Sequence, residues 1–281
     1  MANLKLSAFA DEYSNSFDKQ LEYLKDNNIE YIELRFLDGK SIADLCEDEV
    51  WEVKKKLEDA NIKVSAIGSP LGKINLCDDF SEHLKKCKNV FKTARILGVE
   101  NIRMFSFYLP EGKTREDCRD EVLSKLGQMV DLAEQYGVTL CHENEAKIYG
   151  ESPEYCLDIL SHFGGRLKCV FDMGNFVLDG YKPFPDGYEM LKDYIEYFHI
   201  KDSLYAGAIV PPGCGEASIP EIFERVKKDF KRDVLVTLEP HLETFSGLNQ
   251  LVGKNFDNPY KFESAEAAFD EAVKRIKEIL L

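Results

Sequence analysis

The sequence of 281 residues lacks a long apolar run and a basic N-terminal region followed by an apolar core. No stretch approaches the roughly 18–20 apolar residues of a membrane-spanning helix, so we expect no membrane partner. The opening residues, MANLKLSAFADEYSNSF, do not have the pattern of a secretory signal. We therefore expect a cytoplasmic protein.

Paired cysteines and clustered basic residues are also missing. The eight cysteines are scattered without a C-x-x-C pair, which argues against a zinc knuckle and a disulfide framework. Only 36 Lys and Arg stand against 51 Asp and Glu, for a net charge of −15. Because phosphate binding depends on clustered lysine and arginine, we expect no nucleic-acid partner.

What the sequence does contain is a repeated unit. Four times an amphipathic helical segment runs into Asn or Gly, then into Ile or Val and a short apolar strand. The junctions, at Asn28, Asn61, Gly98 and Gly137, are 33, 37 and 39 residues apart. Asn and Gly tolerate the left-handed conformation that ends many helices. The spacing suits one helix, one strand and two short loops.

Eight segments have a strand pattern, and a loop and a helical pattern follow each of them. They are residues 4–10, 31–36, 64–69, 101–107, 139–143, 169–172, 197–200 and 234–239. Strict alternation implies a parallel sheet with right-handed crossovers. No G-x-G-x-x-G follows the first strand, which favours a closed (β/α)8 TIM barrel over a doubly wound sheet. We see no linker and predict a single domain over residues 1–281.

Charged or metal-binding residues stand at the ends of the last four predicted strands: Glu143, Asp172, His199 and Glu239. In a (β/α)8 barrel the carboxyl ends of the strands form the active face. Three carboxylates converging there would repel one another strongly without a cation. One imidazole and three carboxylates suit one divalent ion: Mn²⁺, Mg²⁺ or Co²⁺, with Zn²⁺ also possible. We therefore predict a metal site.

Each residue also has an ordinary structural interpretation. Asp172 alone would be read as a helix N-cap or a turn residue, and Glu239 alone as the partner of a nearby lysine. His199 alone would be read as a core histidine with satisfied hydrogen bonds. The four together favour the metal site, because unrelated caps are not expected at the same depth on consecutive strands.

The strand-end motifs carry a family resemblance. HENE at the fifth strand, FDMGN at the sixth, FHIKD at the seventh and LEP at the eighth resemble the xylose-isomerase-like TIM-barrel superfamily, of sugar phosphate isomerase/epimerase type. The stretch PPGCGEASIPEIFERV (211–226) resembles the family's loop before the seventh helix. By motif, the resemblance implies that Glu143, Asp172, His199 and Glu239 are metal ligands. In epimerase members the two glutamates also act as the acid/base pair.

The resemblance implies a metal-dependent sugar isomerase or epimerase acting on a small sugar or polyol. It would abstract a proton next to a carbonyl and stabilise the enediolate with the metal. The alternative is a lyase that dehydrates an inosose or a 3-keto sugar at the same metal site. An endonuclease IV-like repair enzyme would need a multinuclear metal site with additional histidines and a basic groove. The sequence has only five histidines and a net charge of −15, which disfavour this class. A non-enzymatic binding module and a homo-oligomer both stay open.

Two departures from the family pattern leave the substrate open. Many members read Glu-Asn-His at the fifth strand, whereas this chain has Glu145 in place of the histidine. Ketose 3-epimerases have an arginine a few residues past the seventh-strand histidine, where this chain has Ser203, Leu204 and Tyr205. The H-x-K-D version in this chain resembles uncharacterised and dehydratase-like members.

Several further residues are candidates for substrate contact or ligand orientation. Lys201 either holds a substrate hydroxyl, carboxylate or phosphate, or forms a salt bridge to Asp202 or Glu239. Arg103 on the fourth strand either reaches substrate in the barrel mouth or forms an internal ion pair. Asn175, together with the residue at position 145, is a candidate for orienting the ligands.

The remaining observations concern the second strand, two histidines and the aromatic residues. Glu33 and Arg35 on the second strand either contact substrate in the barrel mouth or form an internal ion pair. His142 and His241 are each close in sequence to a ligand, so we expect their side chains on the other face of their strands. The aromatic residues at positions 107, 108 and 176 could form a sugar-stacking wall, although the core is the ordinary place for them.

Overall fold

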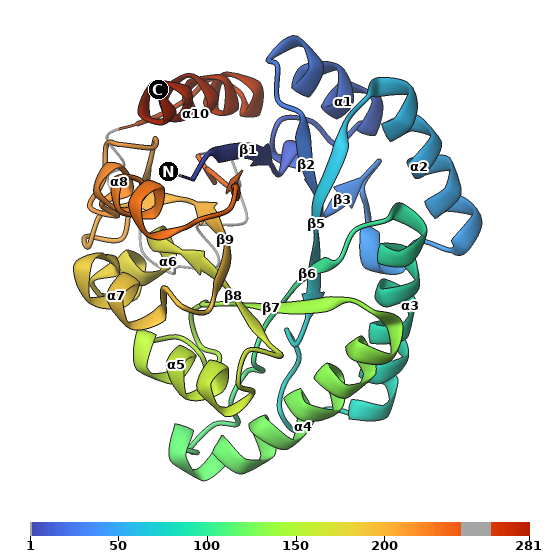
Figure 1. Cartoon of the computed structure of the whole chain (residues 1–281), viewed down its shortest axis with the longest axis vertical. Helices are drawn as coiled ribbons and strands as arrows, with labels where there is room; N and C mark the ends of the chain where they lie inside the picture. The colour runs from blue at the N-terminus through green and yellow to red at the C-terminus, as the bar shows by residue number, and fades with distance from the viewer. Residues whose placement is uncertain (1, 243–259) are drawn as a thin grey trace.

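Eight parallel strands surrounded by helices form the centre of the molecule (Figure 1). The computed structural model describes residues 2–242 and 260–281. The strands pair in the order β1-β12-β9-β8-β7-β6-β5-β2. Their bounds are β1 Leu4–Ala8, β2 Tyr31–Leu34, β5 Lys63–Leu71, β6 Asn101–Met104, β7 Thr139–Glu143, β8 Lys168–Asp172, β9 Ile195–Ile200 and β12 Val234–Leu238.

Helices alternate with these strands and form an outer ring around them (Figure 1). Their bounds are α1 Phe17–Asp26, α2 Glu47–Ala60, α3 Phe80–Leu97, α4 Arg115–Tyr136, α5 Pro153–His162, α6 Met173–Leu178, α7 Tyr188–Leu191, α8 Ile219–Asp229 and α10 Ala265–Leu280. Two short hairpins, β3 Phe36–Leu37 with β4 Lys40–Ser41 and β10 Asp202–Ser203 with β11 Ile209–Val210, lie outside the main sheet. The predicted (β/α)8 barrel is confirmed.

The predicted helix ends have the expected backbone geometry. Asn61, Gly98 and Gly137 end α2, α3 and α4 in the left-handed conformation, with φ of 55°, 75° and 64°. Asn28, just after α1, has φ of 53°. These residues turn the chain sharply from each helix into the next strand, as the repeat predicts.

The barrel has a seam between its first two strands. β1 and β2 are neighbours in space, but in the described residues they are the two ends of the hydrogen-bonded strand order. Side chains bridge this region instead. Ser7 on β1 bonds Ser65 on β5 at 2.7 Å, and the Ser65 hydroxyl donates to the carbonyl of Ile32 on β2 at 3.0 Å.

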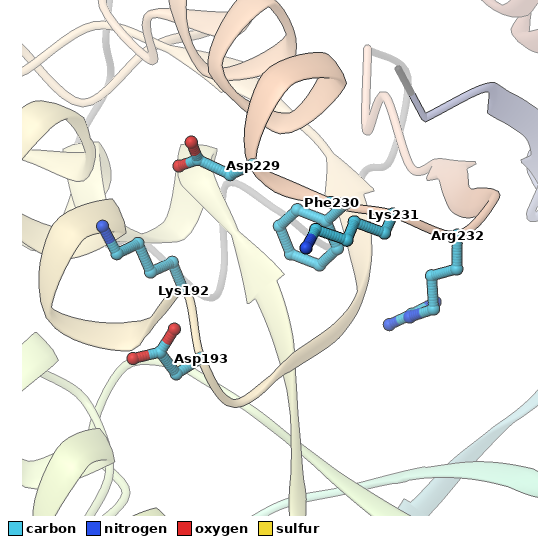
Figure 2. A pocket seen from close by; sticks show the side chains of 6 residues that line it. All are labelled: Lys192, Asp193, Asp229, Phe230, Lys231 and Arg232. Atoms are coloured by element: carbon cyan, nitrogen blue, oxygen red, sulfur yellow. The ribbon is translucent and has the colours of Figure 1, made fainter.

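A cavity of about 550 Å³ lies at the other end of the barrel from the predicted site. Figure 2 shows the side chains that line it. Its walls come from the segment before β9 and the segment between α8 and β12, near the amino ends of these strands. The lining residues are Lys192, Asp193, Asp229, Phe230, Lys231 and Arg232. Because barrel enzymes carry their chemistry at the carboxyl ends of the strands, we do not take this cavity as the active site.

No helix in residues 2–242 or 260–281 is long and apolar enough to cross a lipid bilayer. The extent of the domain over residues 1–281 stays a prediction.

The loop after β9 is built around one buried carboxylate. Asp202 accepts backbone N–H groups of four residues at 2.8 to 3.1 Å: Ser203, Gly213, Gly215 and Ala217. Burial raises the pKa of Asp202 despite these donors. The glycine-rich stretch before α8 therefore curls closely around the side chain that directly follows Lys201 in the sequence.

Adding one methyl group to this loop is expected to destabilise the protein. A Cβ atom on Gly215 would lie 2.1 Å from Asp202 Oδ1 and 2.6 Å from the Ser203 carbonyl oxygen. We expect Gly215→Ala to lower the free energy of unfolding by about 1–3 kcal/mol, as overpacked sites do. Urea denaturation followed by circular dichroism measures this difference.

The matched control is Gly127→Ala in the middle of α4, where the nearest atom to a new Cβ is 3.8 Å away. Because alanine favours a helix more than glycine does, this variant should be more stable by about 0.5–1 kcal/mol. Equal stabilities for the two variants would contradict the close packing around the carboxylate at position 202.

Candidate metal and active site

The four predicted ligands converge at the carboxyl ends of neighbouring strands. Glu143, Asp172, His199 and Glu239 are buried, and each offers a ligand atom within 4.8 Å of those of the other three. Strand register explains this meeting. Asp172 on β8 pairs with His199 on β9, and the backbone N–H of Glu239 donates to the carbonyl of Ile200.

Alternation along each strand directs these side chains into the barrel. An apolar layer is formed by residues of five strands, with Ala66, Cys141, Val170, Tyr197 and Leu235 packed together. Side chains two positions apart on a strand share one face. Glu143, Asp172 and His199 each follow a member of that layer by two positions: Cys141, Val170 and Tyr197, respectively. The polar cluster therefore lies on top of a short apolar plug.

The imidazole of His199 lies at the centre of the cluster. Its Nδ1 atom is 2.9 Å from Glu143 Oε1 and 3.2 Å from Glu239 Oε2. Its Nε2 atom is 3.1 Å from Glu33 Oε2. Burial alone would lower the pKa of His199, but the carboxylates of Glu143 and Glu33 raise it well above its ordinary value.

Cations also control the ionisation of the two glutamates. Burial opposes the charged form of Glu143, yet His199 and Arg103 lower its pKa to about 2. Burial likewise opposes the charged form of Glu239, yet Lys201 and His241 hold its pKa well below the ordinary value. Both glutamates are therefore carboxylates at neutral pH, the state that a metal ligand requires.

Asp172 caps a helix, which is the ordinary role considered for it from the sequence, and its carboxylate also lies in the cluster. It is the N-cap of α6 and accepts the backbone N–H of Asn175 at 2.8 Å. Its other oxygen, Oδ2, accepts from Lys201 Nζ at 2.9 Å. Burial raises the pKa of Asp172 to about 6, although the Lys201 ammonium opposes this shift. The cap directs this carboxylate into the cluster.

The other predicted site residues divide into those that join the cluster and one that does not. Lys201 pairs with Asp172 rather than Asp202, and lies 3.5 Å from Glu239 Oε2. Asn175 accepts from Lys201 Nζ at 3.0 Å, which agrees with an orienting role. Glu145 instead pairs with Lys73 at 2.8 Å, and this ion pair is partly exposed.

Arg103 forms internal ion pairs, one of the two alternatives that the sequence left open. Its Nη1 atom lies 3.2 Å from Glu143 Oε2 and 3.7 Å from Glu239 Oε1.

Two of the three aromatic residues that were candidates for a sugar-stacking wall are core residues. Phe107 and Phe176 are fully buried and pack on other aromatic rings.

The side chains of His142 and His241 were both predicted to point away from the cluster, and only that of His142 does. His142 is fully buried and bonds Ser106 at 2.9 Å, away from the cluster, as predicted. The prediction for His241 is wrong, because its Nε2 atom lies 3.2 Å from Glu239 Oε1. β12 ends at Leu238 and the backbone of His241 has φ of 45°, so strand alternation no longer applies there.

Arg35 forms internal ion pairs, one of the two alternatives that the sequence left open, but sequence reasoning missed the acidic partners that link it to the cluster. Arg35 bonds Asp11 at 2.9 Å, Glu12 at 3.1 Å and Glu239 at 2.8 Å. His241 Nδ1 is 2.9 Å from Glu12 Oε1. The consecutive acidic pair after the first predicted strand was the available signal. This network joins the seam of the barrel to Glu239.

We expect the loss of Arg35 to be costly for folding. Arg35→Met would leave Asp11, Glu12 and Glu239 as neighbouring buried carboxylates without their shared cation. Removing one partner of a buried ion pair typically costs about 3–5 kcal/mol. Urea denaturation of the variant and the wild type measures the difference in free energy of unfolding.

Arg225→Met is the control, because Arg225 on the outer side of α8 makes two ion pairs that are open to solvent, with Glu189 and Asp229. Its loss should leave the unfolding midpoint within experimental error, since exposed ion pairs contribute little. If Arg35→Met were as stable as the wild type, the ion pairs of Arg35 would not stabilise the region between β1 and β2.

The cluster fits a divalent metal ion. Two buried carboxylate oxygens, Oε2 of Glu143 and Oε2 of Glu239, accept no well-aligned hydrogen bond within the described part of the chain, although cationic side chains lie 3.2 to 3.5 Å from them. Buried acceptors without a well-aligned donor are costly, and a metal ion would satisfy both. Three carboxylates and one imidazole are a hard to borderline ligand set, of the kind that Mg²⁺, Mn²⁺, Co²⁺ and Zn²⁺ accept.

The fold and this cluster define a (β/α)8 barrel whose mouth holds a buried carboxylate and histidine group that could bind a metal ion. Residues 21–279 match the family described as the xylose isomerase-like TIM barrel. The chain belongs to this family. No curated protein sequence matches it.

Solved structures share the fold at low sequence identity. The probable 3-DHS dehydratase AsbF of Bacillus anthracis has a TM-score of 0.74 at 19% identity, covering 99% of each chain. The IOLI protein with a binding zinc atom has a TM-score of 0.74 at 21% identity, covering 98% of each. D-allulose 3-epimerase of Methylomonas sp., in complex with D-allulose, has a TM-score of 0.73 at 15% identity, covering 99% of this chain and 98% of the other.

Proposed function

We propose that this protein is a divalent-metal-dependent isomerase or epimerase of a small sugar or polyol derivative. Glu143, Asp172, His199 and Glu239 are the proposed metal ligands. The observation that carries the proposal is the meeting of their ligand atoms within 4.8 Å at the active face of the barrel. Neighbours in fold that are named as an epimerase and as a zinc-bound protein support it.

The charge of the barrel mouth supports a divalent cation there. Six carboxylates of the described residues take part in the ion pairs of this network: Asp11, Glu12, Glu33, Glu143, Asp172 and Glu239. Three permanently charged cations face them, Arg35, Arg103 and Lys201. Two imidazoles, those of His199 and His241, add positive charge when protonated, because neighbouring carboxylates raise the pKa of each despite burial. A divalent ion reduces the excess of negative charge. When bound, it supplies positive charge that stabilises negative charge developing on substrate oxygens.

Glu143 and Glu239 are the proposed acid/base pair. They approach His199 Nδ1 from two strands, with oxygens at 2.9 and 3.2 Å. Arg103 and Arg35 hold one oxygen of each glutamate at 3.2 and 2.8 Å. Such fixed carboxylates can remove a proton from the carbon next to a carbonyl and return one to the opposite side.

A lyase that dehydrates an inosose or a 3-keto sugar is the second candidate. The observation that favours it is the ammonium of Lys201, which lies 3.5 Å from Glu239 Oε2. An N–H donor beside the base could protonate a hydroxyl as it leaves. A neighbour in fold is named as a probable dehydratase. Both candidates begin with removal of a proton next to a carbonyl.

Metal analysis and a substrate panel test the proposal. Protein purified without chelators should contain close to one divalent ion per chain by mass spectrometry of the metal. It should then be assayed with ketoses, inososes and keto-glycosides in deuterated water. Deuterium incorporation without loss of a hydroxyl would indicate an isomerase or epimerase. Release of water with new ultraviolet absorbance would indicate a lyase.

An Asp193→Asn variant, in the cavity at the amino end of the barrel, is the control for both measurements. It should keep the metal content and the rates of the wild type. Wild-type protein that takes up no divalent ion after incubation with Mn²⁺, Mg²⁺, Co²⁺ or Zn²⁺ would disprove the proposed function.

A further inference from the structure

A second buried carboxylate, Glu33, contacts His199 from outside the group of proposed ligands. It belongs to β2, which is separated from β9 by β12 and β1 around the barrel. Its side chain is fully shielded from solvent. His199 Nε2 lies 3.1 Å from Glu33 Oε2, whereas Nδ1 faces Glu143 and Glu239. The two nitrogens of one ring therefore face two different sets of carboxylates.

Both oxygens of Glu33 are engaged. The Tyr197 hydroxyl donates to Oε1 at 3.0 Å, and His199 Nε2 is the partner of Oε2. Tyr197 and His199 are two positions apart on β9 and so share one face of the strand. A carboxylate is buried at low cost only when its oxygens have such donors. Glu33 is thus held in place by the imidazole of His199 and by the phenol of Tyr197.

The imidazole has little freedom to rotate away. Phe9 packs edge-on against His199 with the ring centroids 5.1 Å apart, and Tyr197 packs at 5.5 Å. With Nε2 held by Glu33, Nδ1 is the nitrogen directed at two of the three candidate carboxylate ligands, Glu143 and Glu239. A carboxylate on the far nitrogen of a metal-binding histidine fixes its tautomer and increases its basicity as a ligand.

We propose that Glu33 is a positioning residue of the metal site, which holds His199 so that Nδ1 is presented to the ion. This inference rests on the proposed function. It assigns Glu33 no contact with substrate or metal. Loss of such a carboxylate typically weakens metal affinity about 10- to 100-fold. A purely structural Glu33 would change stability and leave the affinity of the folded protein for metal unchanged.

Glu33→Gln and Tyr197→Phe test the inference as a matched pair. Glutamine keeps the shape of the side chain and removes its charge. Phenylalanine removes the second donor to Glu33 but leaves the carboxylate on His199. Titration calorimetry with Mn²⁺ should show a loss of affinity of about 10- to 100-fold for E33Q and a smaller loss for Y197F. The visible absorption of the Co²⁺ form should change in E33Q, because the imidazole ligand is less well oriented.

Circular dichroism and the melting temperature of the metal-free variants establish that they are folded. If E33Q does not fold, Glu33→Asp replaces it, since the shorter carboxylate cannot keep the 3.1 Å contact without movement. E33D should also bind Mn²⁺ more weakly. Wild-type affinity in the folded variant, or a loss no larger than that of Y197F, would overturn the inference alone. Wild-type protein that binds no metal would overturn the proposed function as well.

Discussion

Glu239→Gln is expected to abolish turnover and leave the protein folded. Glu239 is both a proposed metal ligand and one of the proposed acid/base pair. Loss of a general base alone typically lowers rates 10²- to 10⁴-fold, so we expect kcat to fall about 10³-fold or more. Glutamine has the same shape but no negative charge. It cannot take up a proton from the substrate at neutral pH.

The surroundings of Glu239 indicate why the fold should survive. Its Oε1 atom accepts from Arg35 at 2.8 Å, and a glutamine carbonyl can accept the same hydrogen bond. Arg35 also keeps its pairs with Asp11 and Glu12. The far-ultraviolet circular dichroism spectrum of the variant should therefore match that of the wild type.

The measurement is kcat on whichever substrate of the panel the wild type turns over, with the metal content of both proteins determined in parallel. Glu221→Gln, an exposed glutamate in α8, is the control and should keep the wild-type rate. A wild-type-like rate for the variant at position 239 would remove this residue from the mechanism.

Removal of the metal is the second change for which we expect a large effect. A ligand that binds only the folded state at 100 times its Kd adds about 2.7 kcal/mol to the free energy of unfolding. For a protein of this size that corresponds to a rise in Tm of roughly 5 °C. Chelation should therefore lower Tm by that amount and abolish activity, and added Mn²⁺ should restore both.

Asp172→Asn separates metal binding from helix capping. Asparagine caps a helix about as well as aspartate, so α6 should still begin at Met173. The variant loses the negative charge that a divalent ion prefers in its ligands. Differential scanning fluorimetry with and without Mn²⁺ should show the rise in Tm for the wild type and for the control, Asp193→Asn, but not for D172N. A metal-dependent rise in D172N equal to that of the wild type would exclude Asp172 as a ligand.

The strands were predictable because each is a short, mainly apolar run that alternates with a helical pattern. An Asn or Gly at the helix end marks the start of several of them. All eight predicted strands are present, and the differences lie at their ends. The fourth was expected to reach residue 107, but β6 ends at Met104. The apolar residues continue into a connection in which Phe105 and Phe107 donate to the carbonyls of Leu71 and Gly72. Apolar character alone does not distinguish a strand from a buried loop.

The proposed ligands were predictable for a related reason. They occupy similar positions at the ends of consecutive strands, and parallel strands in a barrel bring such positions to one end. The partners of these residues were only partly predictable. The sequence left Lys201 either as a substrate contact or as the partner of Asp202 or Glu239. It lies 3.5 Å from Glu239, but its shorter contact, at 2.9 Å, is with Asp172. Asp202 turns instead toward the backbone of the following loop.

The sequence by itself determined the alternation of strands and helices, the left-handed turns at Asn61, Gly98 and Gly137, and the depth of four polar side chains. These properties depend on residues close together in the chain. Only the tertiary structure decided that Arg35 contacts Glu239, 204 positions away, and that Glu33 contacts His199, 166 positions away. Closure of the barrel brings these charges together, and burial then makes their pairing strong, because little water remains to screen them.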